Sequence, residues 1–261
     1  MKLFSFVFFI ILSINLYAYK MASLANPNVI SMAVMIEKGY INAEFVPVTG
    51  DISSLVGLIR SKKVDVIAVN YEAAEKISKL TGWIYSGSTI SRAVYIITNK
   101  PIDNKDVLEN RKIVSSFRGG SPDILFQKLN LKNQPTYTDM QIAVQLFLKG
   151  DFDTIVLPEP HVSNLLLKLS KLQKNYYVYD IVDLIGKDFR FPINAILCKD
   201  KETDKVLKEA LIKSVDFINQ NPAEATKIFE KYFKNYFKLN FPFEAFNNAI
   251  ESGRLKFEYS K

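Results

Sequence analysis

The sequence predicts an α/β protein of two similar lobes, whose mainly parallel sheets are joined by two crossover strands. Hydrophobic strand patterns alternate with helical patterns along the 261 residues, which is typical of parallel sheets covered by helices on both faces. A helix–strand–helix unit at residues 51–74 recurs without a gap at residues 139–162. In the second unit, Pro158 and Pro160 end the strand abruptly, because proline lacks the N–H that a strand needs.

The repeat has a constant offset, since 139 − 51 and 153 − 65 both equal 88. Asp65 and Asp153 occupy matching positions just before the apolar strand. The matching apolar pairs are Leu55 with Ala143, Leu58 with Leu146, Ile59 with Phe147 and Ile67 with Ile155. This offset is too long for a solenoid, so it favours two lobes facing each other. The alternative is that any two helix–strand units look alike, and the aligned aspartates argue against it.

The first lobe is expected to begin with a strand at residues 19–24. Asn26 is a suitable N-cap for the helix that follows, Pro27 fits its first turn, and Gly39 fits its end. Further strand patterns lie at residues 43–48, 64–69 and 93–98, with helical patterns at residues 29–36, 52–61 and 72–80. Residues 83–91 are rich in Gly, Ser and Thr and are expected to be irregular.

The second lobe repeats this scheme after Asn99–Pro101, where the chain is expected to cross between lobes. Helical patterns lie at residues 106–110, 124–129, 141–149 and 161–172, and strand patterns at residues 112–117, 136–138, 154–157 and 176–181. The return crossover is expected at residues 191–198, followed by helices at residues 204–219 and 222–237 and a closing segment at residues 243–250. We therefore expect residues 19–92 and 197–261 to form one lobe, and residues 98–192 to form the other.

The first 18 residues have the order of a secretory signal peptide. Lys2 precedes an apolar run at residues 3–12, and Leu16-Tyr17-Ala18 ends in a small residue. The run is short for a membrane span, which needs about 20 apolar residues. We expect cleavage after Ala18, a periplasmic location, and no lipid anchor, because no cysteine lies near the cleavage point.

Composition excludes several kinds of site. The only cysteine, Cys198, lies in an apolar stretch and is expected to be buried and inert, and the only histidine is His161. Zinc, iron–sulfur and triad chemistry are therefore not expected, nor is any cofactor. The 34 basic and 27 acidic residues are interleaved along the chain, which indicates a solvated surface rather than the clustered charge of nucleic-acid binders.

Three motifs together resemble the substrate-binding proteins of ABC transporters with the type II periplasmic-binding fold, in particular the nitrate/sulfonate/taurine group. They are Ser23-Leu24-Ala25-Asn26-Pro27 opening a helix, Lys63-Val64-Asp65-Val66-Ile67-Ala68 before and within a strand, and Leu157-Pro158-Glu159-Pro160-His161. The resemblance covers about residues 19–237. It implies a ligand bound in a cleft between the lobes, hinge closure and no catalysis. The lipid-attachment cysteine of many relatives is absent, as is the cysteine cluster of the thiamine-precursor synthases with this fold.

Four helix N-termini are expected to meet in that cleft, where their N–H groups and dipoles suit an anion. Two glycines beside Arg118 would let the backbone approach a ligand closely. Alternatively, the glycines only make a turn and Arg118 pairs with a surface carboxylate. Glu159 would favour an amine or amidine, or it caps a helix or pairs with a lysine; Tyr71 would stack on a ring or only pack beneath the hinge. The candidate ligand-binding residues are Ser23, Ala25, Asn26, Pro27, Asn28, Asn70, Tyr71, Arg118, Gly119, Gly120, Ser121, Glu159 and His161.

We therefore expect a monomeric extracytoplasmic protein that captures a small polar or anionic molecule and delivers it to an ABC permease with its ATPase. Two alternatives remain: an enzyme of the same fold, such as a chorismate dehydratase-like lyase, or a periplasmic sensor module. The signal peptide argues against the enzyme, because such enzymes act on cytoplasmic substrates.

Overall fold

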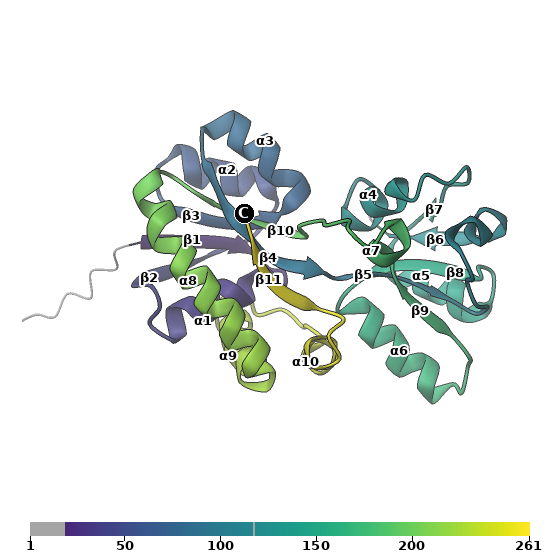
Figure 1. Cartoon of the computed structure of the whole chain (residues 1–261). Helices are drawn as coiled ribbons and strands as arrows, with labels where there is room; N and C mark the ends of the chain where they lie inside the picture. Colours follow the sequence, from purple (N-terminus) through teal and green to yellow (C-terminus); the bar gives the residue numbers. More distant parts are fainter. Residues whose placement is uncertain (1–18, 117) are drawn as a thin grey trace, which may run out of the picture.

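The computed structural model describes residues 19–116 and 118–261, which form two α/β lobes side by side (Figure 1). The expected signal peptide, residues 1–18, lies outside the described residues, and so does Phe117.

The first lobe is built on a six-stranded sheet in the order β11-β4-β10-β3-β1-β2. Its strands are β1 (Tyr19–Leu24), β2 (Ala43–Val48), β3 (Val66–Asn70), β4 (Ile84–Arg92), β10 (Asn194–Cys198) and β11 (Lys256–Ser260). Helices α2 (Ile52–Arg60) and α3 (Tyr71–Thr81) pack on one face. The other face carries α1 (Val29–Glu37), α8 (Lys201–Gln220), α9 (Pro222–Tyr236) and α10 (Phe243–Glu251). Successive residues of β3 belong to opposite cores: Val66 and Ala68 to one, Ile67 and Val69 to the other.

The second lobe is built on a five-stranded sheet in the order β7-β6-β8-β5-β9. Its strands are β5 (Val94–Thr98), β6 (Ile113–Ser115), β7 (Thr136–Tyr137), β8 (Thr154–Pro158) and β9 (Tyr177–Asp180). One face packs against α4 (Ser121–Lys128), α7 (Ile181–Ile185) and the 3₁₀ turn η1 (Lys105–Asn110). The opposite face packs against α5 (Met140–Lys149) and α6 (His161–Lys171).

Both sheets are mixed, whereas the sequence predicted mainly parallel ones. Among the described residues, four of the nine strand pairings are parallel and five are antiparallel. The parallel pairs join strands linked through helices, as expected for such units. The antiparallel pairs involve the crossover strands β5 and β10 and the C-terminal strand β11, which each enter a sheet from the direction of the other lobe.

The repeat predicted from the sequence recurs in the hydrogen bonds. Asp51 and Asp139 cap α2 and α5 by accepting a bond from the N–H two residues later. At the helix ends, Lys62 and Gly150 have left-handed φ values of 54° and 89°. The carbonyls of Asp65 and Asp153 each accept a bond from the residue after a crossover strand, Lys199 and Asn99 respectively. The two units therefore occupy the same place in their sheets.

The sequence suggested that residues 83–91 are irregular. This prediction is wrong, because most of these residues belong to β4. This strand pairs with β10 on one side and β11 on the other. Gly87 in it has a φ of 141°, and an added Cβ would lie 2.8 Å from the Ser260 carbonyl oxygen. Close approach of the C-terminal strand therefore requires glycine here, and that neighbour lies about 170 residues away in the sequence.

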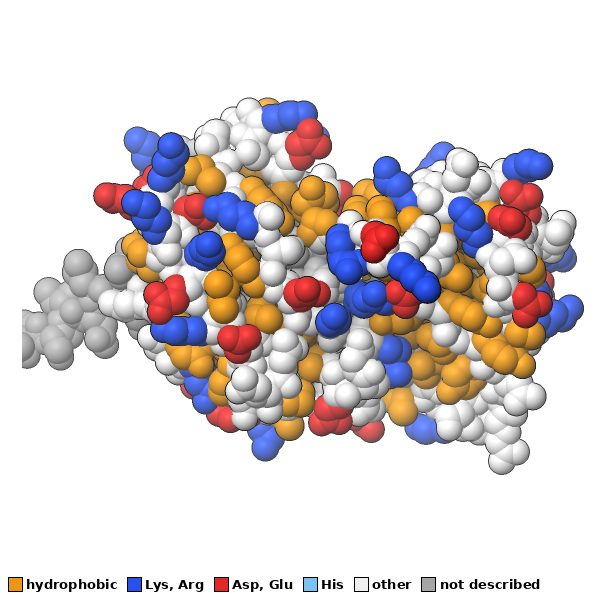
Figure 2. Space-filling model, in the orientation of Figure 1, with side chains coloured by type: hydrophobic (Ala, Val, Ile, Leu, Met, Phe, Trp, Pro, Cys, Tyr) orange, Lys and Arg blue, Asp and Glu red, His pale blue; other side chains and the backbone are white. Residues whose placement is uncertain are grey.

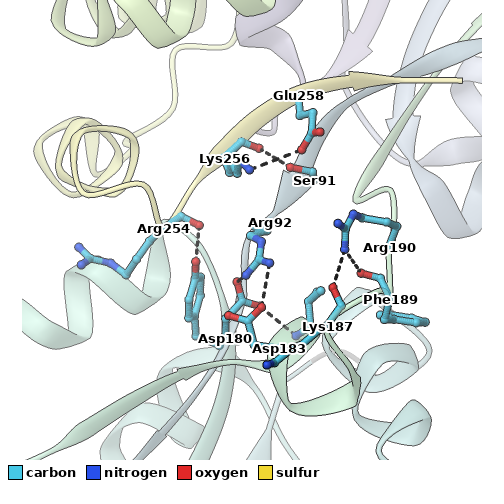
Figure 3. A network of polar contacts seen from close by, with 12 residues as sticks. Ser91, Arg92, Asp180, Asp183, Lys187, Phe189, Arg190, Arg254, Lys256 and Glu258 are labelled. Atoms are coloured by element: carbon cyan, nitrogen blue, oxygen red, sulfur yellow. Dashed lines mark hydrogen bonds and ion pairs between the residues drawn. The ribbon is translucent and has the colours of Figure 1, made fainter.

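The chain crosses between lobes where β4 gives way to β5, before the expected crossing at Asn99–Pro101, and again where residues 191–193 lead into β10. Polar contacts hold the first crossing (Figure 3). Arg92, at the end of β4, donates to Asp180 at 2.6 Å and to Asp183 at 2.8 Å in the second lobe. Hydrogen bonding from Arg92 lowers the pKa of Asp183, so that carboxyl stays ionised.

The C-terminal segment ties the lobes together a third time. Helix α10 lies between the lobes in Figure 1. In the turn after it, the Arg254 carbonyl accepts a bond of 2.8 Å from the Tyr95 hydroxyl of the second lobe. The charged side chains on the visible face are spread over both lobes with signs interleaved (Figure 2), in keeping with the solvated surface expected from the sequence.

We expect Arg92→Ala to lower the free energy of unfolding by about 2–3 kcal/mol, because it leaves the nearly buried Asp180 carboxylate without its charged donor. Arg190→Ala is the matched control, since Arg190 is exposed and donates only to backbone carbonyls of Lys187 and Phe189. Urea unfolding followed by circular dichroism measures both. Equal losses in the two variants would contradict a special role for Arg92.

Candidate functional site

A cleft of about 680 Å³ lies between the lobes and takes residues from both. Eleven of the thirteen residues proposed from the sequence line it: Ala25, Asn26, Pro27, Asn28, Asn70, Arg118, Gly119, Gly120, Ser121, Glu159 and His161. These residues come from four separate strand-to-helix turns, so the fold brings the predicted turns to one place, at the sheet edges where α/β proteins bind ligands.

Ser23 and Tyr71 do not line the cleft. Ser23 is fully buried, and its hydroxyl donates to the carbonyls of Leu24 and Ala68. The Tyr71 ring packs edge-on against Tyr85 and Phe191, with ring centres 6.3 and 5.7 Å apart. Since Phe191 belongs to the return crossover, Tyr71 packs beside the hinge, which is the alternative that the sequence left open.

The first lobe contributes a group of asparagine side chains. The Asn26 side-chain oxygen accepts from the Asn28 N–H at 3.0 Å in the turn before α1. The N-cap of α1 is Asn28, not Asn26 as the sequence predicted. The Asn28 amide donates to the Asn70 side-chain oxygen at 3.1 Å, which links the ends of β1 and β3. An amide can both donate and accept, so Asn28 and Asn70 retain capacity for a polar ligand.

The second lobe contributes the turn that opens α4. Arg118 is exposed, and its guanidinium lies 5.7 Å from the centre of the Tyr137 ring. Gly119 donates its N–H to Asp123 at 2.7 Å with a φ of 81°, a conformation that favours glycine. Burial would raise the pKa of Asp123, but hydrogen bonds from Tyr137, Gly119 and Gln127 lower it below its usual value. The α4 turn therefore already holds a negative charge, on the Asp123 carboxylate.

Glu159 is buried and already paired. Its side chain is 0 % exposed and accepts from the Ser163 N–H and hydroxyl, both at 3.0 Å. Arg254 donates to the same carboxylate at 3.0 Å from the other lobe's C-terminal segment. Burial raises the pKa of Glu159, and the bonds from Ser163 and Arg254 offset this in part. Glu159 thus caps α6 and holds the lobes together, with an arginine in place of the lysine that the sequence reasoning considered.

His161 begins α6 and lines the cleft as well as an adjoining groove between α5 and α6. Burial lowers the pKa of His161, so its imidazole is neutral at pH 7. A neutral imidazole offers one donor and one acceptor.

The sequence reasoning missed Glu72 and the segment between α9 and α10. Glu72 lines the cleft, and its carboxylate accepts from the Ser121 N–H at 3.2 Å and hydroxyl at 3.1 Å in the opposite lobe. Phe233, Asn240 and Phe241 form part of the wall. The density of aromatic residues from Phe229 to Phe246 is the signal that could have pointed to this segment. Nothing local to Glu72 marks it, because its partner lies 49 residues away.

The remaining lining is apolar and comes largely from the strands that cross between the lobes. It includes Ile90, Ala93, Val94, Ile193 and Leu255. Such a surface surrounds and desolvates a bound molecule, while the few polar groups fix its orientation.

Within residues 19–116 and 118–261, no three His, Cys, Asp or Glu side chains are grouped so as to hold a metal ion. Over the same part of the chain, no helix combines the length and the apolar character that crossing a membrane requires.

No family model and no curated protein sequence matches the chain. Solved structures do match it. An ABC transporter structure from Parabacteroides distasonis is 19% identical with a TM-score of 0.68, over 93% of this chain and 86% of that one. The periplasmic aliphatic sulphonate-binding protein SsuA of Escherichia coli is 15% identical with a TM-score of 0.61, over 93% and 80%. SsuA of Xanthomonas axonopodis pv. citri, bound to MOPS, is 13% identical with a TM-score of 0.56, over 93% and 86%.

Likeness at this level of identity shows the fold. The chain has the two-lobed α/β fold of type II periplasmic-binding proteins, as the three sequence motifs implied.

We expect Arg254→Ala to destabilise the protein by about 3–5 kcal/mol at pH 7, because Glu159 then keeps a buried charge without a counterion. Lys256→Ala is the control: its pair with Glu258 is exposed on both sides, so its loss should be about 0–1 kcal/mol. Chemical denaturation gives both values. Because losing Arg254 raises the pKa of Glu159 further, the deficit should shrink as the pH falls from 7 to 5. A deficit independent of pH would argue against an unpaired Glu159.

We expect stability to fall as the pH drops below about 6.5, the ordinary pKa of the His161 imidazole, because the unfolded chain then binds a proton that the folded chain resists. The loss continues until the pH passes the lowered pKa of folded His161. His161→Gln removes this dependence on pH. Melting temperatures of the wild type and the variant, measured across the pH range, therefore differ by the contribution of His161. Parallel pH profiles of wild type and variant would contradict the neutral, buried imidazole.

Proposed function

We propose that the protein is an extracytoplasmic solute-binding protein, which captures a small polar or anionic molecule between its lobes and delivers it to an ABC permease. The observation that carries this proposal is the cleft of about 680 Å³ lined by polar groups of both lobes. Its size suits a metabolite-sized solute. Because its lining comes from both lobes, we infer that binding is coupled to movement of the lobes.

Closure around the solute follows from this geometry. A ligand shifts an equilibrium between open and closed forms only through its different affinity for the two. A solute touching Asn28 and Asn70 in one lobe and the α4 turn in the other makes its full set of contacts only when the lobes meet. The hydrogen bonds from Ser121 to Glu72 already join the lobes at this place.

The sequence and the shared fold support the location and the partner. The order of residues 1–18 favours secretion, and one of the fold's members is named a periplasmic sulphonate-binding protein. The ABC transporter structure with the same fold supports a permease as the partner. We further infer a monomer whose lobes lie close to the expected bounds, with β5 from Val94 onward in the second lobe and β10 from Asn194 onward in the first.

We also infer that the cleft performs no catalysis. Two side chains suited to proton transfer are poorly placed for it: Glu159 is paired with Arg254, and the single histidine is partly buried in the wall and has no hydrogen-bond partner to activate it within residues 19–116 and 118–261. General acid–base work needs a group within reach of the solute and with a pKa near the working pH.

A thermal-shift screen of inorganic anions, sulfonates, pyrimidines and amines tests the proposed function. A bound solute at 100 times its dissociation constant should stabilise the protein by roughly 2.7 kcal/mol. Small-angle scattering should show a smaller radius of gyration with the solute present. Asn70→Ala should weaken binding, whereas Asn175→Ala, an exposed asparagine outside the cleft, should not.

Binding that leaves the radius unchanged and is insensitive to Asn70→Ala would place the site elsewhere. Chemical conversion of the solute by the pure protein would favour the same-fold lyase instead.

A further inference from the structure

The N-terminus of α4 is occupied by a carboxylate from the other lobe. Glu72, in the first turn of α3, accepts the Ser121 N–H at 3.2 Å on one oxygen and the Ser121 hydroxyl at 3.1 Å on the other. These are the donors that an anionic solute would use at this helix. Glu72 therefore lies where the negative group of such a solute would be placed.

Two further N–H groups of the α4 turn are bonded within the second lobe. The Gly119 N–H binds Asp123 at 2.7 Å, and the Ile124 N–H binds the Gly120 carbonyl at 3.0 Å. Arg118 lies over Tyr137, and its charge acts on the neighbouring Asp123. Asp123 thus lies beside the one arginine of the turn, and Glu72 holds the Ser121 donors.

The other helix starts at the cleft are satisfied in the same way. In α1, the Asn28 and Val29 N–H groups bind the Asn26 side chain and carbonyl. The Tyr71 N–H of α3 binds the Ile193 carbonyl, and in α6 the Ser163 N–H binds Glu159. At each of these helix starts, at least one N–H group that could bind an anion is therefore already bonded within the protein.

Glu72 also retains the capacity to bind a solute. Each carboxylate oxygen can accept a second hydrogen bond, and both donors from Ser121 are uncharged, so the negative charge persists. By contrast, the Glu159 charge is balanced by Arg254. The acceptors of Glu72, the amides of Asn28 and Asn70 and the apolar floor suit a molecule that carries N–H groups on a compact apolar body.

We propose that Glu72 sets the charge selectivity of the cleft: it accepts hydrogen bonds from a neutral or positively charged N–H-bearing solute and excludes anions from the α4 N-terminus. This inference rests on the proposed solute-binding function and decides between its polar and anionic forms. An anion would have to displace Glu72 from Ser121 and remain close to its charge, whereas an amine, amidine or ring amide would gain an acceptor.

Sulfate provides a test that needs no identified solute. The ¹⁵N amide signals of Gly119 and Ser121 are followed while sodium sulfate replaces sodium chloride at constant ionic strength. In the wild type these signals should not titrate. In Glu72→Ala the freed donors should bind sulfate about tenfold more tightly or better, the effect of one hydrogen bond to a charged group. Glu75→Ala is the control, because Glu75 lies one turn further along α3, is exposed and pairs with Lys79. Equal sulfate binding by wild type and Glu72→Ala at Ser121 would overturn the proposal.

The solute screen supplies the second test. Among amines, amidines, pyrimidines and sulfonates, compounds that close the lobes should be neutral or cationic. Glu72→Gln should weaken them about tenfold or more by removing a charged acceptor, and Glu75→Gln should leave them unchanged.

A sulfonate that closes the wild-type lobes and binds Glu72→Gln no more tightly would overturn the charge assignment while leaving the solute-binding function intact. If no compound closes the lobes, the proposed function fails for these classes, and the sulfate titration still decides whether Glu72 blocks the α4 N-terminus.

Discussion

The buried carboxylate of Glu159 requires a cation, and this requirement ties the C-terminal segment to the second lobe. The cation is Arg254, which reaches Glu159 across the lobe boundary from the turn after α10. A carboxylate as buried as that of Glu159 is kept ionised only when its remaining hydrogen-bonding capacity is also satisfied, and Ser163 donates to both of its oxygens. Leu255, the residue after Arg254, belongs to the cleft wall, so the shape of the site depends on this contact.

Local chemistry in the sequence accounts for most of the fold. The caps Asp51 and Asp139, the prolines after Leu157 and the apolar strand cores act over a few residues, so they could be interpreted without knowledge of the partners. Strand β4 could not, because its Gly, Ser and Thr residues become a strand only through pairing with β10 and β11. For the same reason, the sequence could not reveal that Arg254 forms an ion pair with Glu159, which lies 95 residues away.

The candidate site shows the same division between position and chemistry. The sequence led to the four turns that line the cleft, because strand ends and helix starts are local features. It could not show that donors in these turns are already bonded within the protein, since Glu72 reaches Ser121 from the opposite lobe. Counting helix N-termini therefore overstates the attraction for an anion when the fold supplies internal carboxylates. The side-chain partners, rather than the helix dipoles alone, define the electrostatics of this cleft.

The position of the two chain crossings also determines how far each part of a lobe moves in the proposed closure. The crossings, the Arg92 ion pairs and the Arg254 contacts all tie the lobes together at their junction. In the proposed closure, this junction is the pivot about which the lobes rotate. Small backbone rotations there are converted into larger displacements at points farther from the pivot. The first turns of α3 and α4 belong to different lobes and are joined by the two hydrogen bonds to Glu72. Weak bonds between such moving parts can hold the lobes together or release them at little energetic cost, while the pivot itself stays intact.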